Sequence, residues 1–157
     1  MKLAVICTGK LKPGPLAELS ADYAKRIGRF CTLELREVPE TKIRDRSPSE
    51  ADRRRASGEE GARILQKAEG ALYALTPEGK PLSTLEWKQL LDRIELSGRA
   101  ASFAIGGPFG LAADVKRNAR ELVSLSPATF THELARVLLL EQLYRAWTLK
   151  KGVPYHY

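Results

Sequence analysis

The sequence predicts an α/β fold built on an open, mostly parallel sheet with helices on both faces. Residues 3–7, 71–75 and 103–105 are short, continuously apolar runs, which are typical of strands covered on both faces. Between these runs, apolar residues recur at intervals of three and four, as they do on the buried face of a helix. Alternating strands and helices favour βαβ units, and a chain of 157 residues fits one domain, residues 1–157.

The composition is that of a basic globular protein. Lysine and arginine number 26 against 19 acidic residues, and the formal net charge of +7 favours polyanionic partners, chiefly nucleic acid. Cys7 and Cys31 are far apart, so neither a disulfide framework nor a zinc site is expected. The opening apolar run is too short for a signal peptide, and no stretch is long enough to span a bilayer. We therefore expect a protein of the reducing cytoplasm, with no metal and no membrane partner.

The first half of the chain is expected to begin with a strand, a helix and a second strand. Residues 3–7 form the first strand, and a loop with Lys10 and Lys12 follows it. Residues 31–38 alternate apolar and polar side chains, which predicts a half-exposed strand. The helix between them has an apolar face made by Leu16, Leu19, Tyr23, Ile27 and Phe30.

Residues 40–55 are strongly charged and have few apolar side chains. We expect a mobile loop, followed by a helix that has Ser47 or Ser49 near its start and continues to about Ala68. Contacts with an RNA backbone would suit this stretch, because phosphate contacts supply most of the affinity for nucleic acid. A flexible, solvated loop is an equally good interpretation. The basic residues concerned are Lys42, Arg44, Arg46, Arg53, Arg54 and Arg55.

The second half continues the alternation of strands and helices. The strand at residues 71–75 ends in a loop at residues 76–81. Ser83 or Thr84 caps the next helix, and Gly98 terminates it. Further elements are predicted at residues 103–105 (strand), from residue 112 (helix), at residues 122–125 (strand) and from about residue 132 to residue 149 (helix).

The last predicted helix has two apolar sides, which a surface helix of a monomer rarely needs. One side can pack on the sheet and the other on a second subunit, so the pattern favours a homodimer; deep burial within one chain is the alternative. The broad side consists of Val137, Leu139, Leu140, Leu143, Tyr144, Ala146 and Trp147, and the second patch of Leu134, Leu138 and Leu149 beside Glu141 and Arg145.

Residues 105–111 read I-G-G-P-F-G-L and follow a buried strand directly. Glycine has no Cβ, so a ligand can lie against the backbone there. Loops at the carboxyl ends of strands are where open α/β sheets bind ligands. The spacing matches neither G-x-G-x-x-G nor a P-loop, which excludes both nucleotide fingerprints. On its own, such a loop would be interpreted as a structural turn. The sequence that follows it favours a ligand-binding loop instead.

The chain resembles the RlmH family over essentially its whole length. The resemblance is carried by I-G-G-P-x-G-L at residues 105–111, E-Q-L-Y-R-A at residues 141–146 and P-Y-H at residues 154–156. It implies a SPOUT-type methyltransferase with a C-terminal trefoil knot, an exception to the usual rules of chain topology. It also implies methylation of N3 of a pseudouridine in 23S (large-subunit) ribosomal RNA.

The same resemblance implies S-adenosyl-L-methionine as cofactor, bent among the loops of the knot with its adenine held mainly by backbone groups. Phe109 stands where a polar residue is often seen in the family's glycine loop. The cofactor-binding residues implied by the matched motifs are Leu75, Gly106, Leu125, Ser126, Pro127, Ala128, Thr129 and Phe130.

The resemblance also directs attention to three candidate catalytic residues, Arg145, Tyr155 and His156. Transfer to N3 requires loss of the imide proton, so a base or a cation that stabilises the imidate helps. Arg145 suits the cation's role, His156 suits proton transfer, and Tyr155 could stack on a base. The structural alternatives are a salt bridge from Arg145 to Glu141 and a frayed terminus at His156. His132 is interpreted as a residue that starts a helix.

The sequence thus favours an rRNA methyltransferase that acts on 23S rRNA within the assembled ribosome. A chain this small has limited means of choosing one nucleotide, so we expect a large, shaped substrate surface. The alternative is a non-catalytic RNA-binding or ribosome-binding module that keeps the fold. An α/β enzyme with another nucleotide cofactor is disfavoured, because no phosphate-binding fingerprint is present.

Overall fold

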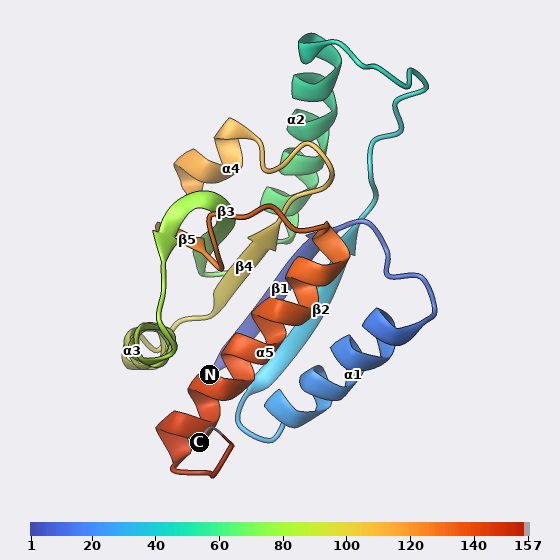
Figure 1. Cartoon of the computed structure of the whole chain (residues 1–157). Coiled ribbons are helices and arrows are strands. Elements are labelled where there is room, and N and C mark those ends of the chain that lie inside the picture. The colour runs from blue at the N-terminus through green and yellow to red at the C-terminus, as the bar shows by residue number, and fades with distance from the viewer. Residues whose placement is uncertain (156–157) are drawn as a thin grey trace.

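The computed structural model describes residues 1–155 and contains one five-stranded, all-parallel open sheet (Figure 1). The strand order is β2-β1-β4-β3-β5, so the predicted parallel α/β sheet is confirmed. Because all strands are parallel, their carboxyl ends lie along one edge of the sheet. The strands are β1 Lys2–Thr8, β2 Thr32–Val38, β3 Ala71–Pro81, β4 Ala101–Ile105 and β5 Glu121–Ser124.

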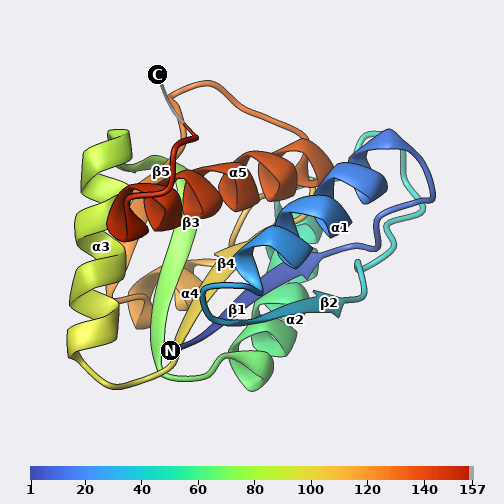
Figure 2. The ribbon, with the colours of Figure 1, turned by 90° about the horizontal axis from the view of Figure 1, so that it is seen from below.

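Helices cover both faces of the sheet, as predicted (Figure 2). α1, α3 and α5 lie on one face, with α5 between the other two, and α2 and α4 lie on the opposite face. The helices are α1 Pro15–Ile27, α2 Glu50–Lys67, α3 Thr84–Leu96, α4 Ala113–Asn118 and α5 His132–Lys151.

Each face of the sheet has its own apolar core, because successive side chains of a strand point to opposite faces. In β1, Leu3 and Val5 pack with the helices α1, α3 and α5, whereas Ala4 and Ile6 pack with α2 and α4. All four side chains are at most 2 % exposed. The continuous apolar run at residues 3–7 therefore reflects a strand buried on both sides. The half-exposed strand predicted at residues 31–38 is β2, at the edge of the sheet.

Side-chain caps fix where the longer helices begin. Of the alternatives in the sequence, Ser49 caps α2, where its hydroxyl accepts a hydrogen bond from the Asp52 amide, and Ser83 caps α3 in a capping box with Glu86. Thr131 caps α5 by accepting a hydrogen bond from the Leu134 amide. This last cap ends the loop after β5 and directs α5 back across the sheet.

β3 is longer than the sequence predicts, because the expected loop at residues 76–81 is partly strand. β3 pairs with β5 through Leu75, shifts register, and pairs again at Lys80 and Pro81. Gly79 lies so close to β5 that an added Cβ would be 2.7 Å from the backbone of Leu122 and Val123. The glycine and proline residues that indicated a loop instead permit a bulge within a continuing strand.

α5 packs between α1 and α3 along its broad apolar side, as the sequence pattern required. Leu139, Leu140 and Leu143 are fully buried. Arg136 is also buried on this side, at 3 % exposure, where Nη1 donates to Glu37 Oε1 at 2.7 Å and Nη2 donates to the Gly9 carbonyl at 3.0 Å. On the outer side, Leu134 remains 37 % exposed.

Candidate active site

A cleft of about 1210 Å³ opens at the carboxyl ends of the strands. It is lined by the segments that follow β1, β2, β4 and β5, by the bulged part of β3 and by the start of α5. In Figure 1 this region is at the upper end of the sheet, where α5 begins. The cleft therefore lies where parallel α/β sheets commonly bind ligands.

Nearly all of the predicted cofactor residues line this cleft. They come from the end of β3, the loop after β4 and the loop after β5. Pro127 is exposed in the loop after β5 but is not part of the lining. The lining members of the predicted set are Leu75, Gly106, Leu125, Ser126, Ala128, Thr129 and Phe130.

The glycine loop folds back on itself so tightly that it needs its glycines. The Gly110 amide donates to the Gly107 carbonyl at 3.0 Å, and Gly110 has φ +74°. A Cβ on Gly106 would be 2.5 Å from the Gly110 carbonyl carbon. An alanine at residue 106 would therefore have to displace backbone, which would deform this wall of the cleft.

The loop after β5 presents backbone groups to the cleft. The Ser126 hydroxyl accepts a hydrogen bond from the Ala128 amide at 3.0 Å. Among residues 1–155, no acceptor is found for the amides of Thr129 and Phe130. These two amides are therefore available as hydrogen-bond donors to a ligand, for example to a ring nitrogen of adenine.

The charges around the cleft are unevenly distributed. Glu78 is held by Lys116 and by the Thr76 hydroxyl, and these hydrogen bonds lower its pKa to about 2. On the side formed by the segments after β1 and β2, Lys10, Lys12 and Lys42 line the cleft and are exposed. This lysine-rich side suits a polyanionic substrate.

His132 is the first residue of α5, as the sequence indicates, but it does more than start the helix. Thr131 provides the cap, and the His132 side chain lines the cleft at 19 % exposure. Its Nε2 lies 3.4 Å from Glu40 Oε1. The sequence analysis missed this pair, because 92 positions separate its members; the available signal was that Glu40 follows the end of a strand.

Glu60 of α2 is a second polar residue that the sequence analysis missed. It is 2 % exposed, and its Oε1 accepts a hydrogen bond from the Thr41 amide at 2.8 Å. Its Oε2 has no hydrogen-bond partner in residues 1–155 and lies 2.9 Å from the place of a Cβ on Gly107. Burial raises the pKa of this carboxyl group. Glu60 thus contacts two segments that border the cleft, the segment after β2 and the glycine loop.

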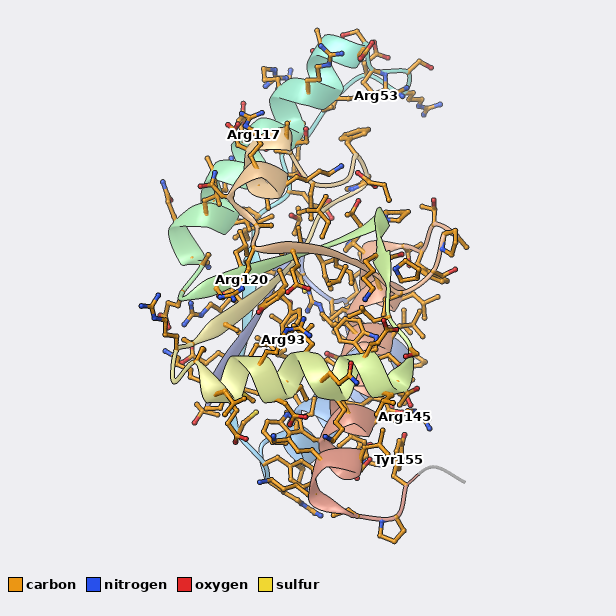
Figure 3. All side chains as sticks on the ribbon, turned by 90° about the vertical axis from the view of Figure 1, so that its left-hand side faces the viewer. Arg53, Arg93, Arg117, Arg120, Arg145 and Tyr155 are labelled. Atoms are coloured by element: carbon orange, nitrogen blue, oxygen red, sulfur yellow. The ribbon has the colours of Figure 1, made fainter. Side chains whose placement is uncertain are left out.

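Arg145 and Tyr155 lie at the opposite end of α5 from the cleft. Figure 3 shows the two side chains together near the C-terminal end of that helix. Arg145 is 13 positions beyond His132, or ~20 Å along the helix axis. Neither residue lines the cleft of its own chain. The third candidate, His156, lies outside the described residues.

At that end of α5, Arg145 makes the salt bridge that was the structural alternative for it. Its Nε donates to Glu141 Oε1 at 2.9 Å, and its guanidinium lies 4.9 Å from the centre of the Tyr155 ring. The hydroxyl groups of Tyr155 and Tyr23 are 3.2 Å apart. Burial and this contact raise the pKa of Tyr155 to about 12, so its hydroxyl stays protonated at neutral pH.

Neither a cluster of metal ligands nor a membrane-spanning helix is found within residues 1–155. No group of three or more His, Cys, Asp or Glu side chains comes together there in a way that could hold a metal ion. Within the same part of the chain, no helix combines the length and the apolar character that crossing a membrane requires.

Sequence comparison connects this fold and cleft with known enzymes. Residues 1–156 match the model of the family described as predicted SPOUT methyltransferase. Three relatives named ribosomal RNA large subunit methyltransferase H cover 99 % of this chain and of their own lengths. They come from Exiguobacterium sibiricum at 37 % identity, Streptococcus thermophilus at 40 % and Streptococcus equi subsp. zooepidemicus at 36 %. The chain therefore belongs to the SPOUT methyltransferase family, and within it to the group of ribosomal RNA large subunit methyltransferase H.

SPOUT methyltransferases use S-adenosylmethionine, and the cleft suits this cofactor. Small-molecule pockets commonly have volumes of about 300–1,000 Å³, so this cleft has space for a cofactor and for part of a substrate. Its walls combine glycine backbone with apolar side chains such as Leu75 and Phe130, which an adenosine can contact, and with available amides after β5.

Proposed function

We propose that the protein transfers a methyl group from S-adenosylmethionine to N3 of a pseudouridine in 23S ribosomal RNA. The observation that carries the proposal is the cleft at the carboxyl ends of the strands, whose lining contains all the residues implied for the cofactor except Pro127. The names of the full-length relatives supply the substrate class, large-subunit ribosomal RNA. A protein acting on ribosomes works in the cytoplasm.

In this proposal, three loops hold the cofactor. Leu75 and the loop after β5, residues 125–130, enclose the adenosine, and Gly106 lets it approach the backbone after β4. When bound, S-adenosylmethionine supplies a methyl group already activated by its sulfonium. The protein's contribution is to align N3 of the substrate with that group and to keep water out.

The proton on N3 needs an acceptor, and His132 is the described residue best placed for this role. It lines the cleft, and Glu40 Oε1, 3.4 Å from its Nε2, would hold the imidazole ring in position. His156 is the second candidate for this proton. Arg145 would stabilise negative charge on the imidate, and Tyr155 would stack on the substrate base.

These roles of Arg145 and Tyr155 require a second chain. Because Arg145 is ~20 Å along α5 from the cleft of its own chain, and Tyr155 packs against Arg145, we propose a homodimer in which α5 of one subunit runs along α5 of the other. Leu134 and Leu138 supply an apolar stripe on the outer side of α5 for this contact. In an antiparallel pair, the Arg145 end of one helix lies beside the cleft end of its partner.

We also propose that residues 1–157 form one domain that ends in a trefoil knot. Both cores share a single sheet, which supports one domain. β5 lies at the edge of the sheet, yet α5 packs across β1 and β4 at its centre, and the loops after β4 and β5 line the same cleft. This course of the chain is compatible with a knot. An experimentally determined backbone path from residue 101 to residue 152 tests whether the knot is present.

The proposed function is tested by transfer of labelled methyl from S-adenosylmethionine to ribosomes that lack the modification. We expect incorporation into 23S rRNA at a single pseudouridine, and little incorporation into protein-free rRNA. Gly106→Ala should abolish transfer and cofactor binding measured by calorimetry, because its Cβ would collide with the Gly110 backbone.

The matched control for that variant is Gly58→Ala. A Cβ at residue 58 meets nothing within 4 Å, and the residue lies in α2, so the variant should keep full activity and gain up to about 1 kcal/mol of stability. RNA binding by the wild type without any methyl incorporation or cofactor binding would contradict the proposal and favour the non-catalytic RNA-binding module. Equal methylation of naked rRNA and ribosomes would contradict recognition of the assembled particle.

A further inference from the structure

A second, smaller hollow adjoins the cleft between the start of α2 and the glycine loop. Its volume is about 280 Å³. Pro108 and Phe109 line both this hollow and the main cleft, so the two spaces adjoin at the tip of the loop. The remaining lining residues of the hollow are Glu50, Arg53, Arg54 and Ser57.

The hollow contains an arginine that its own chain leaves largely unpaired. Arg54 pairs with Glu50. Arg53 is exposed, and its Nε donates to the Pro48 carbonyl at 3.1 Å. Within the described part of the chain, the terminal nitrogens of Arg53 have no carboxylate partner. Figure 3 shows Arg53 near the end of α2 that is distant from Arg145.

The position of Arg53 favours an anion rather than a further protein contact. Of the three arginines at residues 53–55, Arg54 pairs with Glu50, and Arg55 pairs with Asp52 and Glu59. Arg53 is therefore the member of this group whose guanidinium is left for an external anion. A phosphate suits it, because a guanidinium forms charge-assisted hydrogen bonds with phosphate oxygens.

Phe109 supplies the second half of a nucleotide site. It is half-buried at the tip of the glycine loop, where it lines both the hollow and the cleft. An aromatic ring beside a cation is the arrangement with which proteins bind unpaired nucleotides, since the base stacks on the ring and the phosphate pairs with the cation.

We propose that Phe109 and Arg53 form a subsite for an unpaired RNA nucleotide next to the one that is methylated. This inference rests on the proposed function and extends it. It places the neighbouring nucleotide of the RNA strand on the side of the cleft that faces the start of α2. The base stacks on Phe109, and a phosphate of the same strand binds Arg53.

The first test compares Phe109→Ala and Phe109→Trp with the wild type. Loss of one base stack should raise KM for unmodified ribosomes by roughly tenfold in Phe109→Ala, and Phe109→Trp should restore it. kcat and the Kd for S-adenosylmethionine, measured by calorimetry, should change less than twofold. A KM in Phe109→Ala that is within twofold of the wild-type value would overturn the subsite.

The second test uses salt dependence, which a purely structural role would not change. Arg53→Gln should make the slope of log KM against log salt shallower by about 0.7, as expected for one lost contact to a single-stranded phosphate. Arg99→Gln is the matched control, since Arg99 is equally exposed but precedes the amino end of β4, away from the cleft. Identical slopes for Arg53→Gln and Arg99→Gln would overturn the role of Arg53.

A binding measurement separates this proposal from the proposed function. Fluorescence anisotropy with an oligouridylate of about eight nucleotides should show weaker binding to Phe109→Ala and Arg53→Gln than to Arg99→Gln. If the wild type binds the oligonucleotide in this pattern but methylates no ribosomes, the subsite stands and the proposed reaction fails. If binding is the same in all variants, the subsite fails, whatever the enzyme's activity.

Discussion

His132 starts α5, as the sequence indicates, and the structure also places its side chain in the cleft. As the first residue of a helix it has a sufficient structural explanation, yet the structure adds Glu40 on one side and the cleft on the other. A histidine with a carboxylate neighbour in a ligand-sized cleft is suited to proton transfer. His132 and His156 are therefore both candidates for the group that accepts the N3 proton.

We expect His132→Gln to lower kcat for methyl transfer by a factor of about 10²–10⁴ while the Kd for S-adenosylmethionine stays within a few-fold of wild type. Glutamine retains hydrogen-bonding groups but cannot accept the proton. Single-turnover kinetics on unmodified ribosomes measure the effect, and His156→Gln is the parallel variant. A normal rate for His132→Gln with a strongly reduced rate for His156→Gln would transfer the role to His156.

Glu60 contributes a pH dependence that can be isolated by one substitution. Burial raises its pKa in the folded chain above the ordinary value of 4.5, so the unfolded chain loses this proton first as the pH rises. The stability associated with Glu60 is therefore fully present below 4.5 and is lost as the pH rises through the folded-state pKa.

Glu60→Gln should remove this loss, because the amide oxygen can still accept the hydrogen bond from Thr41 and carries no charge. We expect the variant to gain free energy of unfolding relative to wild type as the pH rises above 4.5, and to be at least as stable at pH 7. Urea unfolding across this range measures the difference. Parallel stability curves for the two proteins would show that the carboxyl group does not titrate abnormally.

At the level of elements, α5 connects the two parts of the proposed site. Its first turn borders the cleft, its broad side fills the space between α1 and α3, and its last turns hold Arg145 beside Tyr155. A single straight helix cannot bring both of its ends to one cleft. If two such helices pair in antiparallel fashion, Arg145 of each lies beside the cleft of the other subunit. Substitution of an exposed leucine on α5 tests this pairing.

Leu134→Glu should weaken the proposed dimer, because it places a charge in the outer apolar stripe of α5. Leu134 is 37 % exposed in the single chain, so its replacement should leave the fold intact. Analytical ultracentrifugation should show dissociation at concentrations where the wild type is dimeric. Leu96→Glu is the control, since Leu96 is 88 % exposed at the end of α3. A dimer unaffected by Leu134→Glu would exclude this face of α5 as the interface.

The elements follow from local patterns, and the sequence predicts them well for that reason. Buried runs such as residues 3–7 and caps such as Ser83 carry their signal within a few positions. The continuation of β3 past residue 75 carries no such signal, because it depends on pairing with β5 more than 40 positions later. The ion pair of Arg136 with Glu37 was missed for the same reason, since 99 positions separate the two residues.

The candidate site likewise has one part that the sequence predicts and another that only the structure reveals. The cofactor loops follow strands directly, so motif and position along the sheet agree, and most of the predicted residues line the cleft. The roles of His132, Glu40 and Glu60 depend on contacts among α5, the end of β2 and α2, which only the folded chain brings together. The distance of Arg145 from its own cleft likewise becomes visible only in the structure.

At the level of the whole molecule, exposed basic side chains border both cavities. The net charge of +7 includes Lys10, Lys12 and Lys42 along the cleft, and Arg53 in the adjoining hollow. This distribution favours a polyanionic substrate that crosses the carboxyl edge of the sheet. In the proposed dimer, Arg145 and Tyr155 of the second subunit would meet the same substrate.

In the proposed dimer, the cofactor cleft of one chain works together with Arg145 and Tyr155 of the other, and mixed dimers can test this arrangement. Gly106→Ala and Arg145→Ala should each be inactive alone. When equal amounts are unfolded and refolded together, half of the dimers combine both variants, and each of these contains one intact composite site. We expect recovery of about a quarter of the wild-type methyl transfer to unmodified ribosomes. No recovery, with mixed dimers verified by differential tags, would contradict the composite site and would require each chain to carry a complete site of its own.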